Sequence, residues 1–317
     1  MTRHLLLRLV QGALVLLVMS FLVYALMGLM PGDPVEMMAA ASPSMTPEDV
    51  ARLKALYGID QPLPHRYLVW LGRALSGDFG YSRLSALPVA ATLAPALRNS
   101  LTLMSGGLSL GLLLALPCGA VAALRQGGWG DRALNLLAFA TISLPMFWLG
   151  LLLIMLFAVD LAWLPASGVE TVGGGDLADR LRHLLLPTLT VALGCFGPYL
   201  RYSRAALGAA LREPWVRTAR AKGLSWRQVL LRHCLRHALI PLCTVLALDF
   251  GGLFSGVLVT ESVFAYPGMG KLIYDAVLGS DYNLALAALL LATLTTLLGT
   301  LAADLAHGLL DKRVRAA

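Results

Sequence analysis

Long runs of apolar residues alternate with short polar segments along this chain. A helix needs about 20 consecutive apolar residues to cross roughly 30 Å of hydrocarbon, and the runs fall near that length. They lie at about residues 9–30, 101–124, 133–159, 184–200, 239–260 and 284–310. The pattern predicts an all-α polytopic membrane protein with six transmembrane helices, of which the fourth is the shortest.

The polar segment between the first two runs carries start and stop signals for a short helix. Thr46 is a typical N-cap, Pro47 suits the first helical position, and Gly58 marks a stop. A second helix is predicted over residues 64–76, with an apolar face that packs on the spans or lies at the membrane surface. Packing is the preferred interpretation. The face consists of Tyr67, Trp70, Leu71 and Leu75.

We expect three regions. Residues 1–30 form an N-terminal transmembrane helix, because an apolar run of about 22 residues is longer than that of a signal peptide. Residues 31–100 form an extracytoplasmic segment with short helices. Residues 101–317 form a five-helix core with a long polar loop at 201–238. Glycines four apart at Gly107 and Gly111, and again at Gly252 and Gly256, allow close helix packing.

Composition agrees with a membrane protein. Of the 317 residues, 58% are hydrophobic and 14% are charged, and the mean hydropathy is +0.73, which leaves little polar surface for a water-soluble domain. Basic residues outnumber acidic ones by 25 to 18. In a polytopic protein such an excess reports orientation in the lipid bilayer, so we do not expect a nucleic-acid partner.

The distribution of basic residues predicts the orientation. Lys and Arg are concentrated near both termini and in the 201–238 loop. The short loops on the opposite side, 160–183 and 261–283, hold only Arg180, Arg182 and Lys271. Because cytoplasmic loops carry the excess of positive charge, both termini are predicted to be cytoplasmic.

The 201–238 loop is the densest basic segment. Pro214 can open one helix, Gly223 can turn the chain, and Ser225 can cap a second helix that runs into the fifth span. Small residues at Ala219 and Ala221 suit close contact with a protein groove. The alternative is a solvated face attracted to anionic lipid. From Arg212 onward, the basic residues of this loop are Arg212, Arg217, Arg220, Lys222, Arg227, Arg232 and Arg236.

The segment Arg217-Thr-Ala-Arg-Ala-Lys-Gly223, followed by Ile240-Pro241, resembles the cytoplasmic signature loop of bacterial binding-protein-dependent ABC permeases of the peptide/nickel importer family. The resemblance extends over nearly the whole chain. Other matching stretches are Thr46-Pro-Glu, Tyr57-Gly-Ile-Asp-Gln-Pro-Leu-Pro64, Trp70-Leu-Gly, Gly77-Asp-Phe-Gly80, Ser143-Leu-Pro-Met-Phe-Trp148, Trp163-Leu-Pro165 and Glu261-Ser-Val-Phe-Ala-Tyr-Pro-Gly-Met-Gly270.

This resemblance implies a type I ABC importer permease fold in a bacterial inner membrane. It also implies partners: a homologous second permease, two ATPase subunits and an extracytoplasmic solute-binding protein. The coupling helix, which lies in a cleft of an ATPase subunit, would comprise Arg217, Thr218, Ala219, Arg220, Ala221, Lys222 and Gly223. More distant importers have Glu-Ala-Ala where this chain has Arg217-Thr218-Ala219, the variant expected of the peptide/nickel branch. The spacing from Gly223 to Ile240-Pro241 is also longer than in those relatives, so contacts are not carried over from sugar importers.

The chain is not expected to be an enzyme or to bind a cofactor. Its Gly270-Lys271 pair has Ala265 where a P-loop needs its first glycine, and Leu272 where it needs Ser or Thr. ATP and Mg would therefore be bound by partner subunits. His233 and His237 are four residues apart, but without converging carboxylates or thiolates they are expected to extend the basic face and not to bind metal.

Two further sites are candidates. Asp249 lies inside the fifth apolar run, where a charge costs about 2.5–3.5 kcal/mol, so it faces either the substrate pathway or a neighbouring helix. An outer gate or receptor contact is suggested at the 264–270 turn, for which a plain tight turn is the alternative. Its residues are Phe264, Tyr266, Pro267 and Gly268.

The predicted function is that of a permease subunit of an ATP-driven ABC importer, which forms the translocation pathway with a second permease. Short peptides are the expected cargo, and nickel or a metal chelate is the alternative. A self-sufficient secondary transporter is the alternative from another class, and its expected signs are inverted repeats and several intramembrane charges. A membrane-embedded enzyme is a third option, without a supporting motif.

Overall fold

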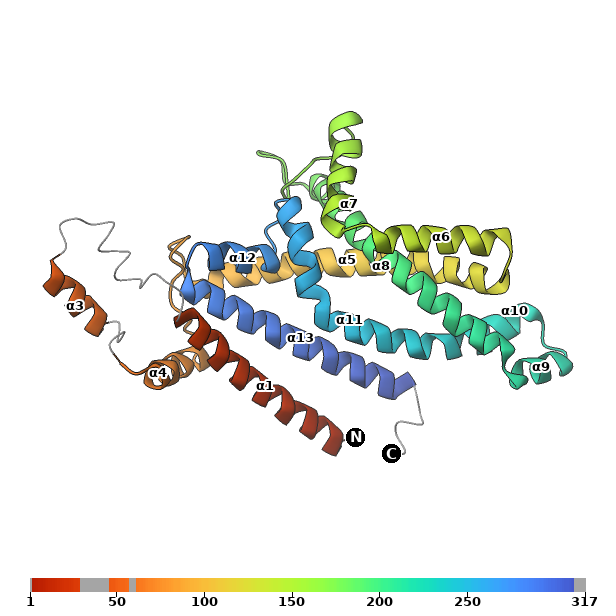
Figure 1. The fold of residues 1–317 in the computed structure, drawn as a ribbon, viewed down its shortest axis with the longest axis horizontal. Helices are drawn as coiled ribbons and strands as arrows, with labels where there is room; N and C mark the ends of the chain where they lie inside the picture. Colours follow the sequence, from red (N-terminus) through yellow and green to blue (C-terminus); the bar gives the residue numbers. More distant parts are fainter. Residues whose placement is uncertain (1, 29–45, 57–60, 311–317) are drawn as a thin grey trace. The chain divides into compact units, whose positions relative to one another are not determined.

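A computed structural model describes residues 2–28, 46–56 and 61–310 (Figure 1). The described residues form helices and no β-strand. An isolated β-bridge joins Tyr81 and Pro88 within those ranges. Two compact units are present. The first contains Met1–Pro95 and Leu272–Leu294, and the second contains Ala96–Lys271 and Thr295–Ala317.

The first unit begins with α1 (Thr2–Gly28), α3 (Pro47–Leu56) and α4 (Leu63–Leu75). Both predicted short helices are confirmed. Thr46 Oγ1 accepts the Asp49 N–H at 3.2 Å, and Asp49 Oδ2 accepts the Thr46 N–H at 3.0 Å, a reciprocal cap. The hydrogen bonds that the Asp49 carboxylate accepts from the Thr46 N–H and from the Thr46 hydroxyl lower the pKa of Asp49 below its ordinary value. The predicted stop at Gly58 lies outside the described residues.

The apolar face of α4 packs on α1. The Tyr67 hydroxyl lies 2.7 Å from Ser20 Oγ, and the Tyr67 ring makes an edge contact with Phe21 at 5.2 Å between centroids. Trp70 lies 5.7 Å from the Tyr24 ring. The predicted packing is confirmed for Tyr67 and Trp70. It is wrong for Leu75, the last residue of α4, which is 81% exposed.

A buried carboxylate joins the remote parts of the first unit. Asp281 is 1% exposed and precedes α13 (Tyr282–Leu310). Its carboxylate accepts hydrogen bonds from Ser82 Oγ at 2.6 Å and from the N–H groups of Leu84 and Leu284 at 3.0 and 3.2 Å. Asp281 therefore caps α13 and fixes the loop that leads into α5.

The second unit contains most of the remaining helices. Their bounds are α5 (Val89–Leu124), α6 (Trp129–Ser143), α7 (Met146–Leu153), the π-helical η1 (Ile154–Asp160), α8 (Leu177–Arg212), α9 (Pro214–Ala221), α10 (Trp226–Gln228), the π-helical η2 (Val229–Cys234) and α11 (Leu235–Val263), with α12 (Met269–Leu278) following. The boundary between the units passes through α5, α12 and α13. In Figure 1, α8 runs beside α6 and α11, and it packs against both and against α7.

Glycines on α5 bring its backbone close to α8. A Cβ on Gly107 would overlap Val191, one on Gly111 would lie 2.9 Å from the Ala192 carbonyl oxygen, and one on Gly119 would overlap Ser203. Residues 107, 111 and 119 share a face because they are spaced by multiples of four. The predicted close packing is confirmed for Gly107 and Gly111. The side chains around Gly252 and Gly256 lie outside the described part.

Among the described residues, four helices are long and apolar enough to cross a membrane, or five if one bent pair counts as a span. The bent pair corrects the sequence analysis. Residues 133–159 were expected to be one helix, but α6 and α7 meet at 102° across Leu144 and Pro145, because proline disfavours helix in the residue before it. The predicted fourth span belongs to the 36-residue α8. Six spans and the orientation of the termini remain predictions.

Candidate functional site

The basic loop folds into two short helices joined by a tight corner, which we call the elbow (residues 213–234). Pro214 is the first residue of α9, as predicted, because its fixed φ suits a helix start and its missing N–H has no partner to lose there. Glu213 has extended backbone angles and separates α9 from α8. Helix α9 therefore follows α8 after one residue.

Gly223 forms the corner. Its φ is +84°, in the left-handed region that glycine adopts without steric cost. The Gly223 N–H donates to the Arg220 carbonyl at 2.9 Å, and the Leu224 N–H donates to the Ala219 carbonyl at 3.3 Å. This pair of bonds is a Schellman motif, which satisfies the last carbonyls of α9. The predicted glycine turn is confirmed.

Ser225 starts the second helix of the elbow. The Gln228 N–H donates to Ser225 Oγ at 3.4 Å, and the Ser225 N–H donates to Gln228 Oε1 at 2.9 Å, which is a capping box. From there α10, η2 and α11 follow without a break. The prediction of a helix, a glycine corner and a second capped helix that leads into the fifth span is confirmed.

The inner face of the elbow is part of a hydrophobic cluster. Val216 is 4% exposed, and Val229 and Cys234 are fully buried. They pack with side chains from the end of α8, namely Leu207 and Ala210. Because the free energy of burial scales with the apolar area removed from water, this cluster holds α9 to α8 and η2.

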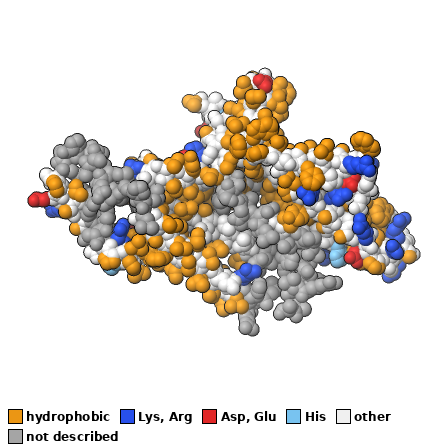
Figure 2. All heavy atoms as spheres, in the orientation of Figure 1, with side chains coloured by type: hydrophobic (Ala, Val, Ile, Leu, Met, Phe, Trp, Pro, Cys, Tyr) orange, Lys and Arg blue, Asp and Glu red, His pale blue; other side chains and the backbone are white. Residues whose placement is uncertain are grey.

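The outer face of α9 is exposed and basic. We call it the docking face, and it consists of Arg217, Thr218, Arg220, Ala221 and Lys222. Figure 2 shows Lys and Arg side chains gathered over α9 and α10. Arg220 lies over the Trp226 ring at 5.4 Å. Ala219, predicted to suit contact with a groove, is half-buried and packs against the inner cluster, so only Ala221 of the two alanines lies on this face.

An open groove of about 440 Å³ runs between α9 and the second helix. Trp215 stacks on His237 at 5.2 Å between centroids and lies 6.3 Å from His233. The two histidines therefore line this groove beside Trp215. They also belong to the basic 201–238 segment. Within the described ranges, no group of three His, Cys, Asp or Glu side chains gathers as a metal site would. The groove is lined by Trp215, Thr218, Ala219, Lys222, Leu224, His233 and His237.

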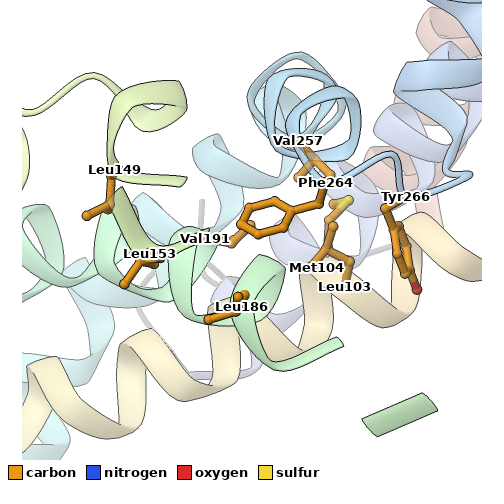
Figure 3. Close-up of a cluster of buried hydrophobic side chains, with 9 residues drawn as sticks. All are labelled: Leu103, Met104, Leu149, Leu153, Leu186, Val191, Val257, Phe264 and Tyr266. Atoms are coloured by element: carbon orange, nitrogen blue, oxygen red, sulfur yellow. The ribbon is translucent and has the colours of Figure 1, made fainter. Parts of the chain in front are cut away.

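The second candidate site is the turn between α11 and α12. Phe264 and Tyr266 are 1% and 5% exposed, Gly268 is buried, and Pro267 is exposed. Figure 3 shows the Phe264 ring pointing toward Val191, in a cluster that includes side chains of α5, α7 and α8. The turn is thus a packed corner in which Pro267 alone of the four predicted residues presents a side chain to the surface.

A buried carboxylate organises this corner, and sequence reasoning did not select it. Glu261 is fully buried; its carboxylate accepts a short hydrogen bond from Ser100 Oγ and accepts the Lys271 N–H at 2.9 Å. Ser100 Oγ in turn accepts the Met269 N–H at 2.7 Å. Any side chain at Gly268 would overlap the Glu261 carboxylate. The sequence signal was the placement of Glu261 at the start of a glycine-rich turn.

Asp249 belongs to α11, but its side chain lies outside the described residues. Its predicted place in the substrate pathway therefore stays a prediction.

Comparisons with known proteins agree over the whole length. The family described as "Binding-protein-dependent transport system inner membrane component" matches residues 115–316, and a family described as the N-terminal part of such membrane components matches residues 1–100. A putative peptide permease protein of Brucella ovis is 35% identical over 318 residues, which cover 99% of both chains.

Two other relatives are named after the transport systems to which they belong. The oligopeptide transport system permease protein AppB of Bacillus subtilis is 33% identical over 99% of both chains. The glutathione transport system permease protein GsiC of Escherichia coli is 35% identical over 95% of this chain and 94% of its own. An inward-facing structure of the MetNI methionine ABC transporter has a chain with a TM-score of 0.55 and 19% identity, covering 69% of this chain and 96% of that one. This likeness confirms the predicted ABC importer permease fold.

Proposed function

The chain belongs to the family of inner membrane components of binding-protein-dependent transport systems, and we propose that it is one of two permease subunits of an ATP-driven importer of short peptides. Membership places it in the inner membrane as a multi-pass permease component, not an enzyme. It also removes the alternatives of a self-sufficient secondary transporter and a membrane-embedded enzyme.

Short peptides are proposed as cargo because three relatives that match almost the whole chain are named for peptides, oligopeptides and glutathione. These names favour peptides over the alternative of nickel or a metal chelate. The partners in the proposal are a homologous second permease, two ATPase subunits that bind ATP and Mg, and a solute-binding protein outside the membrane. Residues 31–100 would lie on that outer side, and residues 101–317 would form the permease core.

The elbow is the observation that carries the proposal. Its inner face is packed onto α8 and η2, and its docking face is exposed and basic. We propose that Arg217, Thr218, Ala219, Arg220, Ala221, Lys222 and Gly223 form a coupling helix that lies in a cleft of an ATPase subunit. An acidic cleft would match this face, because Glu213 is the sole carboxylate among residues 201–238.

The packing explains how such contact would drive transport. ATP binding shifts the permease between inward-facing and outward-facing states only if the contacts of the ATPase subunit differ between these states. A displacement of α9 passes to α8 through the buried Val216 and Leu207, and to the start of α11 through Val229 and Cys234. The elbow therefore joins one contact surface to two long helices.

The replacement Gly223→Val tests the coupling role. Nothing lies within 4 Å of a Cβ at this position, so the variant keeps its packing, but valine is strained at a φ of +84° and rotates the end of α9. We expect normal membrane insertion and abundance, with cargo uptake per ATP hydrolysed about tenfold lower, within the usual range of coupling energies. Reconstituted complexes give both rates.

Gly223→Asn is the matched control, because asparagine adopts left-handed angles more readily than other residues with side chains. It should retain most of the coupling. Normal uptake by Gly223→Val would contradict the coupling role.

The outer corner and Asp249 complete the proposal. Because Phe264, Tyr266 and Gly268 are buried, the proposed role in gating at the outer mouth would act through the packing of this corner, and the exposed Pro267 is the residue that offers a receptor contact. Asp249 is proposed to face the pathway, because a charge in an apolar span needs a polar environment. Asp249→Asn should change uptake while the complex still purifies intact, and exposed Asp160→Asn should change neither. Loss of assembly in Asp249→Asn would instead indicate a contact between helices.

A further inference from the structure

Asp131 accepts hydrogen bonds from three directions. It lies in the first turn of α6 and is 3% exposed. Its Oδ2 accepts the Gly127 N–H at 2.8 Å, which closes the turn after α5. Its Oδ1 accepts Asn135 Nδ2 at 2.7 Å from one helical turn further along α6. These contacts fix the carboxylate within its own corner.

Arg204 on α8 completes the arrangement. Its Nε donates to Asp131 Oδ1 at 2.6 Å, and its Nη2 donates to Oδ2 at 2.8 Å. The planar guanidinium matches both oxygens of a carboxylate, so this pair fixes orientation as well as distance. The Asp131 side chain is 4% exposed and that of Arg204 is 27% exposed, which limits screening by solvent.

The pair joins the α5–α6 corner to the part of α8 that precedes the elbow. Leu207 and Ala210, which follow Arg204 on α8, pack with Val216 of α9. A second contact lies at the last residue of α8, where Arg212 Nη2 donates to Gln126 Oε1 at 2.8 Å. Both contacts tie the 125–131 corner to the base of the elbow.

Stability alone is a weak reason for such a pair. Desolvation of two charges offsets much of their attraction, and apolar side chains of similar volume often stabilise a site equally well. A fork of two short hydrogen bonds sets both the distance and the direction between one point on α6 and one point on α8. The structure therefore points to a geometric role for this pair.

We propose that the Asp131–Arg204 pair is a positioning contact that makes α6 and the α5–α6 corner move together with α8 and the elbow. The inference rests on the proposed coupling role of the elbow. When an ATPase subunit displaces α9, this pair carries the displacement into α6 and leaves the α6–elbow distance unchanged. Without the pair, α8 would slide past α6.

The test measures the distance between α6 and the elbow in the whole importer. Spin-label amino acids replace Leu136 on α6 and Leu231 on η2, both of which are exposed and lie outside the docking face. Pulsed electron resonance then gives the distance distribution without nucleotide and after trapping with ATP and vanadate. The wild-type pair should give one narrow distance that is the same in both states.

Arg204→Gln should lose that narrow distance after trapping, and Arg204→Lys should lose it too, because lysine keeps the charge but not the fork. The double exchange Asp131→Arg with Arg204→Asp should recover it at least in part. Arg132→Gln is the matched control, since it removes an exposed cation beside Asp131, and it should behave as wild type. ATP hydrolysis should stay within about twofold in the variants, because the pair lies outside the docking face.

A narrow, unchanged distance in both Arg204→Gln and Arg204→Lys would overturn the inference, as would a wild-type distance that itself changes on trapping. If Arg204→Gln does not assemble, Arg204→Lys and the double exchange still decide the result. Failure of the elbow's coupling role has a separate signature, because Gly223→Val would then transport normally. If Gly223→Val uncouples while the Arg204 variants keep the narrow distance, only this inference fails.

Discussion

At the residue scale, the elbow was predictable because its chemistry is local. Pro214, Gly223 and Ser225 each act on backbone groups within a few residues, and all three occupy their predicted roles. The buried carboxylates were not predictable in the same way. Ser100 and Glu261 are 161 positions apart, and Asp131 and Arg204 are 73 apart. No local pattern indicates such a partner, because only the fold brings the two residues together.

Glu261→Gln should destabilise the outer corner. A carboxylate has two acceptor oxygens and an amide has one, so either the Ser100 hydroxyl or the Lys271 N–H loses its acceptor inside the protein. An unpaired buried group costs about 1–3 kcal/mol, and the thermal midpoint of the purified subunit should fall accordingly.

Glu170→Gln is the comparison for this variant. Glu170 pairs with Arg180 at 2.9 Å on the surface, where an ion pair contributes about 0–1 kcal/mol. Equal midpoints for the two variants would contradict the structural role of Glu261.

At the element scale, the sequence predicted where helices occur better than where they bend or end. Pro187 and Pro198 lie inside α8, which stays continuous, whereas Pro145 separates two helices at 102°. The same residue type has both outcomes because neighbouring helices decide whether the freed carbonyls find other partners. The π-helical stretches η1 and η2 have no sequence signature that the apolar pattern reveals.

Gly119→Ala tests the close contact of α5 with α8. The new methyl group would overlap Ser203 and lie 2.9 Å from the Leu200 carbonyl oxygen. Overpacking of this kind costs about 1–3 kcal/mol, so we expect a lower thermal midpoint in detergent and reduced abundance in the membrane.

Gly208→Ala on α8 is the matched control. Nothing lies within 4 Å of a Cβ there, and alanine is favoured over glycine inside a helix by about 1 kcal/mol. This variant should be neutral or slightly more stable. A loss of stability equal to that of Gly119→Ala would contradict the close contact with α8 as the cause of the Gly119→Ala effect.

At the scale of the whole molecule, composition and apolar runs sufficed to predict a polytopic helical membrane protein. Many large apolar side chains stay exposed in the single chain, including Leu113 at 70% and Leu136 at 72%. Such surface suits lipid and a second subunit. The described helices account for four or five spans, because α6 and α7 form a bent pair and part of α11 lies outside the described side chains.

Reporter fusions test the predicted topology. Six spans with cytoplasmic termini place a fluorescent protein fused after residue 317 in the cytoplasm, where it folds and fluoresces. Alkaline phosphatase inserted at residue 44 should be active, because that segment is predicted to be outside. An odd number of spans would place the termini on opposite sides of the membrane. A fluorescent protein that fluoresces when fused before residue 1 but not when fused after residue 317 would therefore contradict the prediction.

In the elbow, the residues that determine the backbone shape differ from most of the residues that carry the charge. Its geometry depends on a proline, a glycine, a capping box and a few inward-facing apolar side chains, to which Arg220 adds a contact with the Trp226 ring. Mutations on the outer surface can therefore accumulate while the backbone stays the same. Under the proposed coupling role, a duplicated copy of the gene would change which ATPase subunit it recognises through side-chain exchange alone, and hybrid assemblies would be engineered in the same way.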